Sequence, residues 1–208
     1  MNVAVVPPVH RSGGAPRAHW RADVGPTVLA MAAEMAPDEL TARAVARRMG
    51  LQDPQIWRAV PHGRADILFI VACDLQIRQA EAVAAPAPRR RTALARVAAH
   101  LGRMLAFDFT PGTKAWRRAC AAQSWYWTRD QQRALGTDIP SPFRPIERDA
   151  GGAIAAVIAL YEATFRDACV MEWTLEQAHM ELNDRLRTIG LADLGHTRPA
   201  TGSARAIP

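Results

Sequence analysis

The sequence of 208 residues predicts an all-α fold, and three observations point to it. Apolar residues recur at helical spacing through most of the chain, and no run of alternating β-branched residues suggests a strand. Prolines and glycines cluster between the periodic segments, where turns are needed. Hydrophobic residues make up 49% and charged residues 22%, which is typical of a globular chain and excludes a disordered or collagen-like one.

Eight helices are predicted, and turn-forming residues separate them. Pro26 lies in the first turn of the first helix and Pro37 follows its end, because proline fits the start of a helix and interrupts its interior. Gly50 ends the second helix and Pro61 follows the third. The predicted ranges are 27–35, 41–49, 54–59, 64–84, 92–106, 114–128, 146–171 and 175–191.

Composition excludes several classes of protein. The longest apolar stretch in the body of the chain, 67–73, is far shorter than the roughly 20 residues of a membrane-spanning helix. The run 3–9 has neither the basic start nor the apolar length of a secretory signal, so we expect a cytoplasmic protein. Cys73, Cys120 and Cys169 are widely separated, which favours reduced, buried thiols over disulfides. No metal site and no cofactor is predicted.

The net charge of +6 is unevenly distributed along the chain. Only one of the 26 basic residues is a lysine, and a GC-rich genome alone explains that usage, so the overall charge indicates little. Residues 41–64 are more informative, because this short segment holds five arginines and one acidic residue. A local concentration of arginine favours an anionic polymer as the partner.

The same segment has the pattern of a helix-turn-helix. Val45 and Met49, four residues apart, give the first helix an apolar face, and Gly50 supplies the left-handed residue that ends it. The second helix begins with polar residues, and Ile56 is expected to anchor its buried side.

With its neighbours, this segment resembles the DNA-binding domain of the TetR family of bacterial transcriptional regulators. The motifs that carry the resemblance are Thr41 four residues before Val45-Ala46, Met49-Gly50-Leu51 at the turn, Ile56-Trp57 where the family has Leu-Tyr, and Val60-Pro61-His62-Gly63-Arg64 at the step into the next helix. The resemblance covers residues 26–80 by motif and extends to residue 191 only by layout.

The resemblance implies a homodimeric, ligand-responsive DNA-binding regulator, and specifically a repressor, with a double-stranded DNA operator and a small-molecule effector as partners. We expect affinity to come from phosphate contacts by Thr41, Arg43 and Arg64, with His62 and Trp57 as lesser contacts. Gln52, Gln55 and Arg58 are the predicted base readers, because amides pair bidentately with adenine and arginine with guanine. As an alternative, the arginines form only a solvated helix face.

A ligand-binding stripe is predicted in the second half of the chain. Trp116, Cys120, Gln123 and Trp127 fall on one face of the predicted helix 114–128, and two indoles around an amide suit a small-molecule pocket. An ordinary core stripe is the alternative. The residues predicted to complete the walls are Met104, Phe107, Tyr161 and Phe165.

The last two predicted helices, 146–171 and 175–191, are amphipathic and suit a four-helix homodimer interface, with a hairpin packed within one chain as the alternative. Their apolar stripes are Ile154, Val157, Ile158, Tyr161, Phe165 and Ala168 on the first, and Leu175, Ala178, His179, Leu182, Leu186 and Ile189 on the second.

The linker that contains Pro86, Pro88 and three consecutive arginines marks a domain boundary. We therefore expect a flexible basic arm (1–22), a helix-turn-helix DNA-binding domain with its connecting helix (23–85), a helical ligand-binding and dimerisation domain (86–191) and a flexible tail (192–208). No phosphate-binding loop or nucleophile motif is present, so an enzyme is not expected. The rival function is a TetR-shaped small-molecule or lipid carrier, or a partner-binding module, that no longer binds an operator. Asp53-Pro54 and the short loop between the first two predicted helices favour it.

Overall fold

The computed structural model describes residues 24–85 and 92–189, and within these two ranges the chain forms helices and no strand, as predicted. The predicted arm 1–22, the tail 192–208 and most of the linker lie outside the described residues. The α-helices are α1 (Val24–Glu34), α2 (Ala42–Met49), α3 (Asp53–Ala59), α4 (Arg64–Val83), α5 (Ala93–Asp108), α6 (Thr113–Gln123), α7 (Arg129–Thr137), α8 (Glu147–Ala150), α9 (Ile154–Val170) and α10 (Leu175–Thr188).

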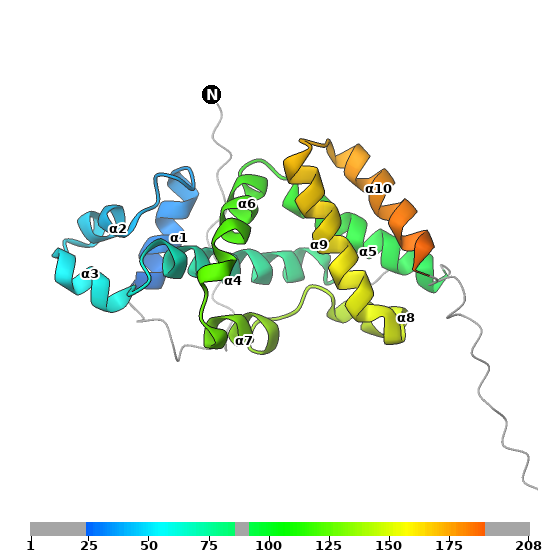
Figure 1. Ribbon diagram of the computed structural model, residues 1–208, viewed down its shortest axis with the longest axis horizontal. Helices are drawn as coiled ribbons and strands as arrows, with labels where there is room; N and C mark the ends of the chain where they lie inside the picture. The colour runs from blue at the N-terminus through cyan, green and yellow to red at the C-terminus, as the bar shows by residue number, and fades with distance from the viewer. Residues whose placement is uncertain (1–23, 86–91, 190–208) are drawn as a thin grey trace, which may run out of the picture.

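Helix α4 runs lengthwise through the molecule and joins its two ends (Figure 1). Helices α1, α2 and α3 lie at one end, and α5, α8, α9 and α10 lie at the other (Figure 1). Most of the α4 side chains are buried, including the whole apolar run 67–73. This run therefore has no polar face because other helices cover it on every side.

The first core forms where α1 and α6 pack against the first half of α4, while α2 packs on α1 and on α3. Val28, Val45, Ile56 and Leu68 are fully buried in it and come from four different helices. Trp116 and Cys120 of α6 also belong to this core, so a helix from the predicted second domain packs with the predicted first domain.

The second core forms between α5, α9 and α10, and it takes up the apolar stripes predicted for a dimer interface. Val157, Ala168, Leu182 and Leu186 are fully or almost fully buried there. Helices α9 and α10 pack against each other, and α10 also packs on α5. Within the single chain, α9 and α10 therefore form a hairpin, and the residues of the two predicted stripes are buried or half-buried.

Two predicted helices are wrong in extent. The predicted helix 114–128 ends at Gln123, a 3-10 turn (Ser124–Tyr126) follows, and α7 was not predicted at all. Thr128 starts α7 through a capping box, in which its Oγ1 accepts from the Gln131 N–H at 3.2 Å and its own N–H donates to the Gln131 side chain at 2.8 Å.

The predicted helix 146–171 is also interrupted. Two 3-10 turns (Arg144–Ile146 and Gly151–Ala153) and the short α8 precede α9, which starts only at Ile154. Gly151 has φ 53°, a left-handed conformation that ends α8 and that glycine adopts readily. In the part of the chain that the structure describes, no helix has the length and apolarity needed to cross a membrane.

The cysteines provide a test of the cores. Cys73 and Cys120 are buried, and the Cys120 thiol donates to the Leu68 carbonyl at 3.3 Å. Burial raises the pKa of Cys120 to about 12 and also raises the pKa of Cys73. At about pH 8, roughly one Cys120 thiol in 10⁴ is then a thiolate, the reactive form.

We therefore expect a disulfide reagent such as DTNB to label Cys73 and Cys120 very slowly in the native protein and rapidly in denaturing guanidinium. Mass spectrometry of digested samples identifies which thiols react. Rapid native labelling of Cys120 would contradict the packing of α6 against α4. Rapid native labelling of Cys73, which is buried with Ala134 of α7, would contradict the packing of α7 against α4.

Candidate functional site

Helix α2 begins and ends as a helix-turn-helix requires. The Thr41 Oγ1 accepts a hydrogen bond from the Ala44 N–H at 3.2 Å and caps the first turn. At the other end Gly50 has φ 65° and ψ 26°, and the Leu51 N–H donates to the Ala46 carbonyl at 2.9 Å. This arrangement closes the helix and redirects the chain, which confirms the predicted role of Gly50.

Helix α3 is anchored on one side and open on the other. Ile56 is fully buried in the first core, as predicted. Gln52 is the residue that caps α3, and its N–H donates to the Gln55 side-chain oxygen at 2.9 Å. Because Pro54 lies in the first turn, its missing N–H leaves no intrahelical hydrogen bond unmade.

The three predicted base readers are all exposed side chains of the α3 segment: Gln52, Gln55 and Arg58. Within residues 24–85 and 92–189, no hydrogen bond or ion pair holds the Arg58 guanidinium. Trp57 is 46% exposed, and its ring lies over Gly63, where an added Cβ would come within 3.0 Å of Cζ3. Trp57 therefore packs on the turn between α3 and α4.

Of the side chains predicted to contact phosphates, some are exposed to solvent and others contact groups of the protein itself. Arg43 is exposed and makes no ion pair with a described residue. Arg64 reaches the Asp38 carbonyl only at 3.5 Å. The backbone N–H of His62 donates to Asp66 Oδ2 at 2.8 Å, and the ring Nδ1 of His62 lies 3.3 Å from Asp66 Oδ1.

Most of the predicted ligand residues divide between the two cores and do not line one common pocket. Trp116 and Cys120 pack in the first core, so the core-stripe alternative describes them. Trp127 follows the end of α6, where its indole N–H donates to the Ala65 carbonyl at 3.1 Å. Met104 and Tyr161 are buried in the second core, with Phe165 against it. Of the other two, Phe107 lies beneath the Arg78 guanidinium and Gln123 is the half-buried last residue of α6.

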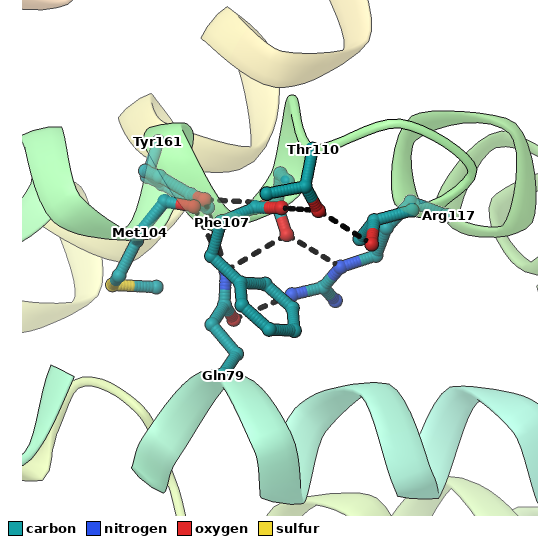
Figure 2. Close-up of polar contacts among 8 residues, drawn as sticks. Gln79, Met104, Phe107, Thr110, Arg117 and Tyr161 are labelled. Atoms are coloured by element: carbon teal, nitrogen blue, oxygen red, sulfur yellow. Dashed lines mark hydrogen bonds and ion pairs between the residues drawn. The ribbon is translucent and has the colours of Figure 1, made fainter. Parts of the chain in front are cut away.

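An interior polar cluster, not predicted from the sequence, lies where α4, α5, α6 and α9 meet. Gln79, Arg117 and Tyr161 come together there (Figure 2), and all three donate hydrogen bonds to the Asp108 carboxylate. The Asp108 carboxylate accepts from the Tyr161 hydroxyl at 2.6 Å, the Arg117 Nε at 2.9 Å and the Gln79 amide at 3.0 Å. Arg117 also donates to the Gln79 side-chain oxygen at 2.5 Å.

Burial governs the electrostatics of this cluster. Asp108 is 1% exposed, and its desolvation raises the pKa of the carboxyl group, against the opposing effects of Arg117 and the three hydrogen bonds. Burial, with the charge of Asp108, raises the pKa of the Tyr161 hydroxyl. Tyr161 is therefore a hydrogen-bond donor, and the cluster joins four helices through mutually satisfied groups.

Two cavities lie elsewhere, and none of the eight predicted ligand residues lines either of them. The first, of about 210 Å³, lies between α1, the α3–α4 turn, α4 and α7. The second, of about 270 Å³, lies near α5 and α8 and is lined in part by His100, Arg103 and the Arg96–Asp149 ion pair. Its Arg103 guanidinium lies 3.3 Å from the His100 Nδ1.

Comparison of the chain with protein-family models, with curated proteins and with solved structures finds no match. In the ranges 24–85 and 92–189, no group of three or more His, Cys, Asp or Glu residues is placed to hold a metal ion. A function must therefore be inferred from the side chains that the structure presents, foremost those of α2 and α3.

The two tyrosines of the chain test the polar cluster. Tyr161→Phe removes the hydroxyl that donates to Asp108, and a hydrogen bond to a charged group contributes about 1.5–3 kcal/mol. We expect the free energy of unfolding, measured by urea titration, to fall by about that amount. Tyr126→Phe makes the same chemical change at a residue that is 67% exposed and is expected to leave stability unchanged. Equal effects of the two variants would exclude a stabilising role for the cluster.

His100 tests the surroundings of the second cavity. Its Nε2 lies 2.7 Å from the Pro142 carbonyl and its Nδ1 faces the donor Arg103, so the buried ring is neutral with its hydrogen on Nε2. Burial lowers the pKa of His100. In the unfolded chain the pKa of His100 is about 6.5, so below this pH the unfolded chain binds a proton that the folded chain does not. The free energy of unfolding therefore falls as the pH drops below about 6.5.

We expect His100→Gln, which cannot titrate, to show a smaller loss of stability than the native chain between about pH 6.5 and the lowered pKa of the buried ring. Urea midpoints measured across this range compare the two proteins. Parallel curves would show that His100 contributes nothing to the pH dependence.

Proposed function

We propose that this protein binds double-stranded DNA through α2 and α3 and acts as a TetR-like transcriptional regulator, a repressor. The observation that carries this proposal is that α3 has a buried anchor residue beside several exposed polar side chains. Ile56 is fully buried in the first core, whereas the side chains of Gln52, Gln55 and Arg58 are exposed, and the Gln55 side-chain oxygen also accepts from the Gln52 N–H. In helix-turn-helix proteins, the residues at the N-terminal end of the second helix contact base edges.

The dimensions of α3 support the proposal. Seven residues of helix rise about 10 Å, and a helix with its side chains, about 10–12 Å across, fits the major groove of about 12 Å. Helices α2 and α3 also lie at one end of the molecule, away from the second core (Figure 1). A duplex can therefore approach this end without meeting α5, α9 or α10.

The charge of the same end supports binding to phosphates. Arg43, Arg47 and Arg58 are exposed and make no ion pair within the described ranges, whereas Arg48 is paired with Glu34 at 2.9 Å. Each phosphate neutralised contributes about 0.9 to the slope of log affinity against log salt concentration. Three free guanidinium groups make binding strongly salt-dependent.

A homodimer and an effector are further parts of the proposed function. A dimer would double these contacts and would read two half-sites about 34–36 Å apart. Since the apolar stripes of α9 and α10 are buried within one chain, the outward faces of these helices are left for a partner copy. Ala155, Ala156 and Ala159 lie on that face of α9, where small side chains let helices approach closely.

Binding to duplex DNA is tested by fluorescence anisotropy with fragments from upstream of the coding sequence and with sequences selected from a random duplex library. We expect a specific complex whose affinity falls steeply with salt. Gln55→Ala and Arg58→Ala should each weaken binding about 5- to 100-fold and relax sequence preference, since a bidentate base contact contributes about 1–3 kcal/mol of discrimination. Arg43→Ala should weaken binding to all duplexes alike and reduce the slope of log affinity against log salt concentration by about 0.9.

Arg148→Ala is the matched control, because Arg148 is an exposed arginine of α8, at the end of the molecule opposite α2 and α3 (Figure 1). This variant should bind as the native protein does. Unchanged binding in Gln55→Ala and Arg58→Ala, or binding without sequence preference, would refute operator recognition and favour the carrier or partner-binding alternative.

A further inference from the structure

The cavity beside the α3–α4 turn has the size of a small-ligand site. Its volume is about 210 Å³, compared with about 150 Å³ for an engineered cavity that binds benzene. The space therefore fits a ligand with one ring and a short substituent. Val24, the residues from Ala59 to His62, and parts of α4 and α7 form its walls.

The walls combine an apolar interior with one acidic side. Val60, Phe69, Ile70 and Ala134 provide the apolar surface. Asp66 and Gln131 provide polar groups, and Asp130 adds a second carboxylate, which is largely exposed and pairs with Arg133 at 3.5 Å. A site with an aromatic ring, aliphatic walls and carboxylates favours a ligand that is both apolar and positively charged.

Asp66 is the decisive residue of this cavity. It is 9% exposed and accepts three contacts, from the His62 N–H at 2.8 Å, the Gln131 amide at 2.8 Å and the His62 Nδ1 at 3.3 Å. A carboxylate offers about four acceptor sites, so one remains. Among the described residues, no arginine or lysine forms an ion pair with Asp66, and His62 supplies charge only when protonated.

The charge of Asp66 is therefore hydrogen-bonded but lacks a permanent counter-ion. Removing a carboxylate from water costs several kcal/mol, and for Asp66 its hydrogen bonds and its place in the first turn of α4 offset part of that cost. A cation placed in the cavity would add an ion pair and could use the remaining acceptor site. A neutral ligand of the same shape would gain only from the apolar walls, and an anion would be repelled.

We propose that this cavity binds a small organic cation, a protonated amine carried on a single apolar ring, with its ammonium group on Asp66 and its ring between the apolar walls. The proposal concerns binding alone and does not depend on recognition of DNA.

Calorimetric titration of the purified protein with benzylamine, protonated at neutral pH, and with the uncharged benzyl alcohol tests this proposal. We expect benzylamine to bind at least about tenfold more tightly than the alcohol, since 1.4 kcal/mol of ion pairing corresponds to that factor. Absence of benzylamine binding, or equal affinity of the two ligands, would overturn the proposal.

Two variants then locate the site. Asp66→Asn keeps an oxygen acceptor but removes the charge, so its affinities for the two ligands should become equal. Ala134→Leu fills the cavity from the α7 wall without touching Asp66, and it should abolish binding of both ligands even if Asp66→Asn fails to fold. Circular dichroism and thermal unfolding check that each variant is folded.

Asp74→Asn is the control, because Asp74 lies further along α4, pairs with Arg78 at 3.6 Å and does not line the cavity. It should bind both ligands as the native protein does. A retained preference for benzylamine in Asp66→Asn, or undiminished binding in Ala134→Leu, would place the ligand elsewhere and overturn the assignment.

Discussion

The burial of α4 is the constraint on which the rest of the structure depends. Its first half packs on α1 and α6, in a core that α2 and α3 complete. Farther along, α4 packs on α5 and places Gln79 in the interior polar cluster. Both cores are therefore built on one continuous helix of 20 residues. A change in the direction of α4 would move α2 and α3 relative to the second core, since interiors packed at this density do not deform gradually.

The polar cluster fixes how α5, α6 and α9 lie against α4. Apolar contacts are non-directional and tolerate small shifts, whereas the contacts of Asp108 with Tyr161, Arg117 and Gln79 require particular distances and angles. A shift of one helix would leave a buried carboxylate partly unpaired, at a cost of about 1–3 kcal/mol for each donor lost. The cluster therefore specifies one arrangement of the four helices at the junction between the two cores.

Local patterns in the sequence predict the helix-turn-helix geometry. They do not predict contacts between residues that are far apart in the sequence. Gly50 and Ile56 have their predicted roles because a left-handed turn and a buried anchor depend on a few neighbouring residues. The cluster could not be predicted, since Gln79 and Tyr161 are 82 residues apart. The start of α7 was predictable in principle, because Thr128 and Gln131 form a capping box, but the aromatic residues just before it continue the helical period and hide the break. Periodicity also cannot tell an apolar face that packs within the chain from one that meets a partner, which is why the stripes of α9 and α10 could be assigned to a dimer interface.

The α3–α4 turn is where the two inferred properties of this protein meet. The residues Ala59 to His62 end α3 on one side and form a wall of the first cavity on the other. The His62 N–H that donates to Asp66 belongs to this turn, so a ligand that shares the Asp66 carboxylate acts on the backbone that fixes the end of α3. A ligand can shift the orientation of α3 only by as much as its affinity differs between orientations, and DNA must then change the affinity of the ligand by the same factor. Because the cavity lies next to the end of α3, one turn of backbone and the Asp66 carboxylate are enough to connect a bound ligand to the helix proposed to contact the bases.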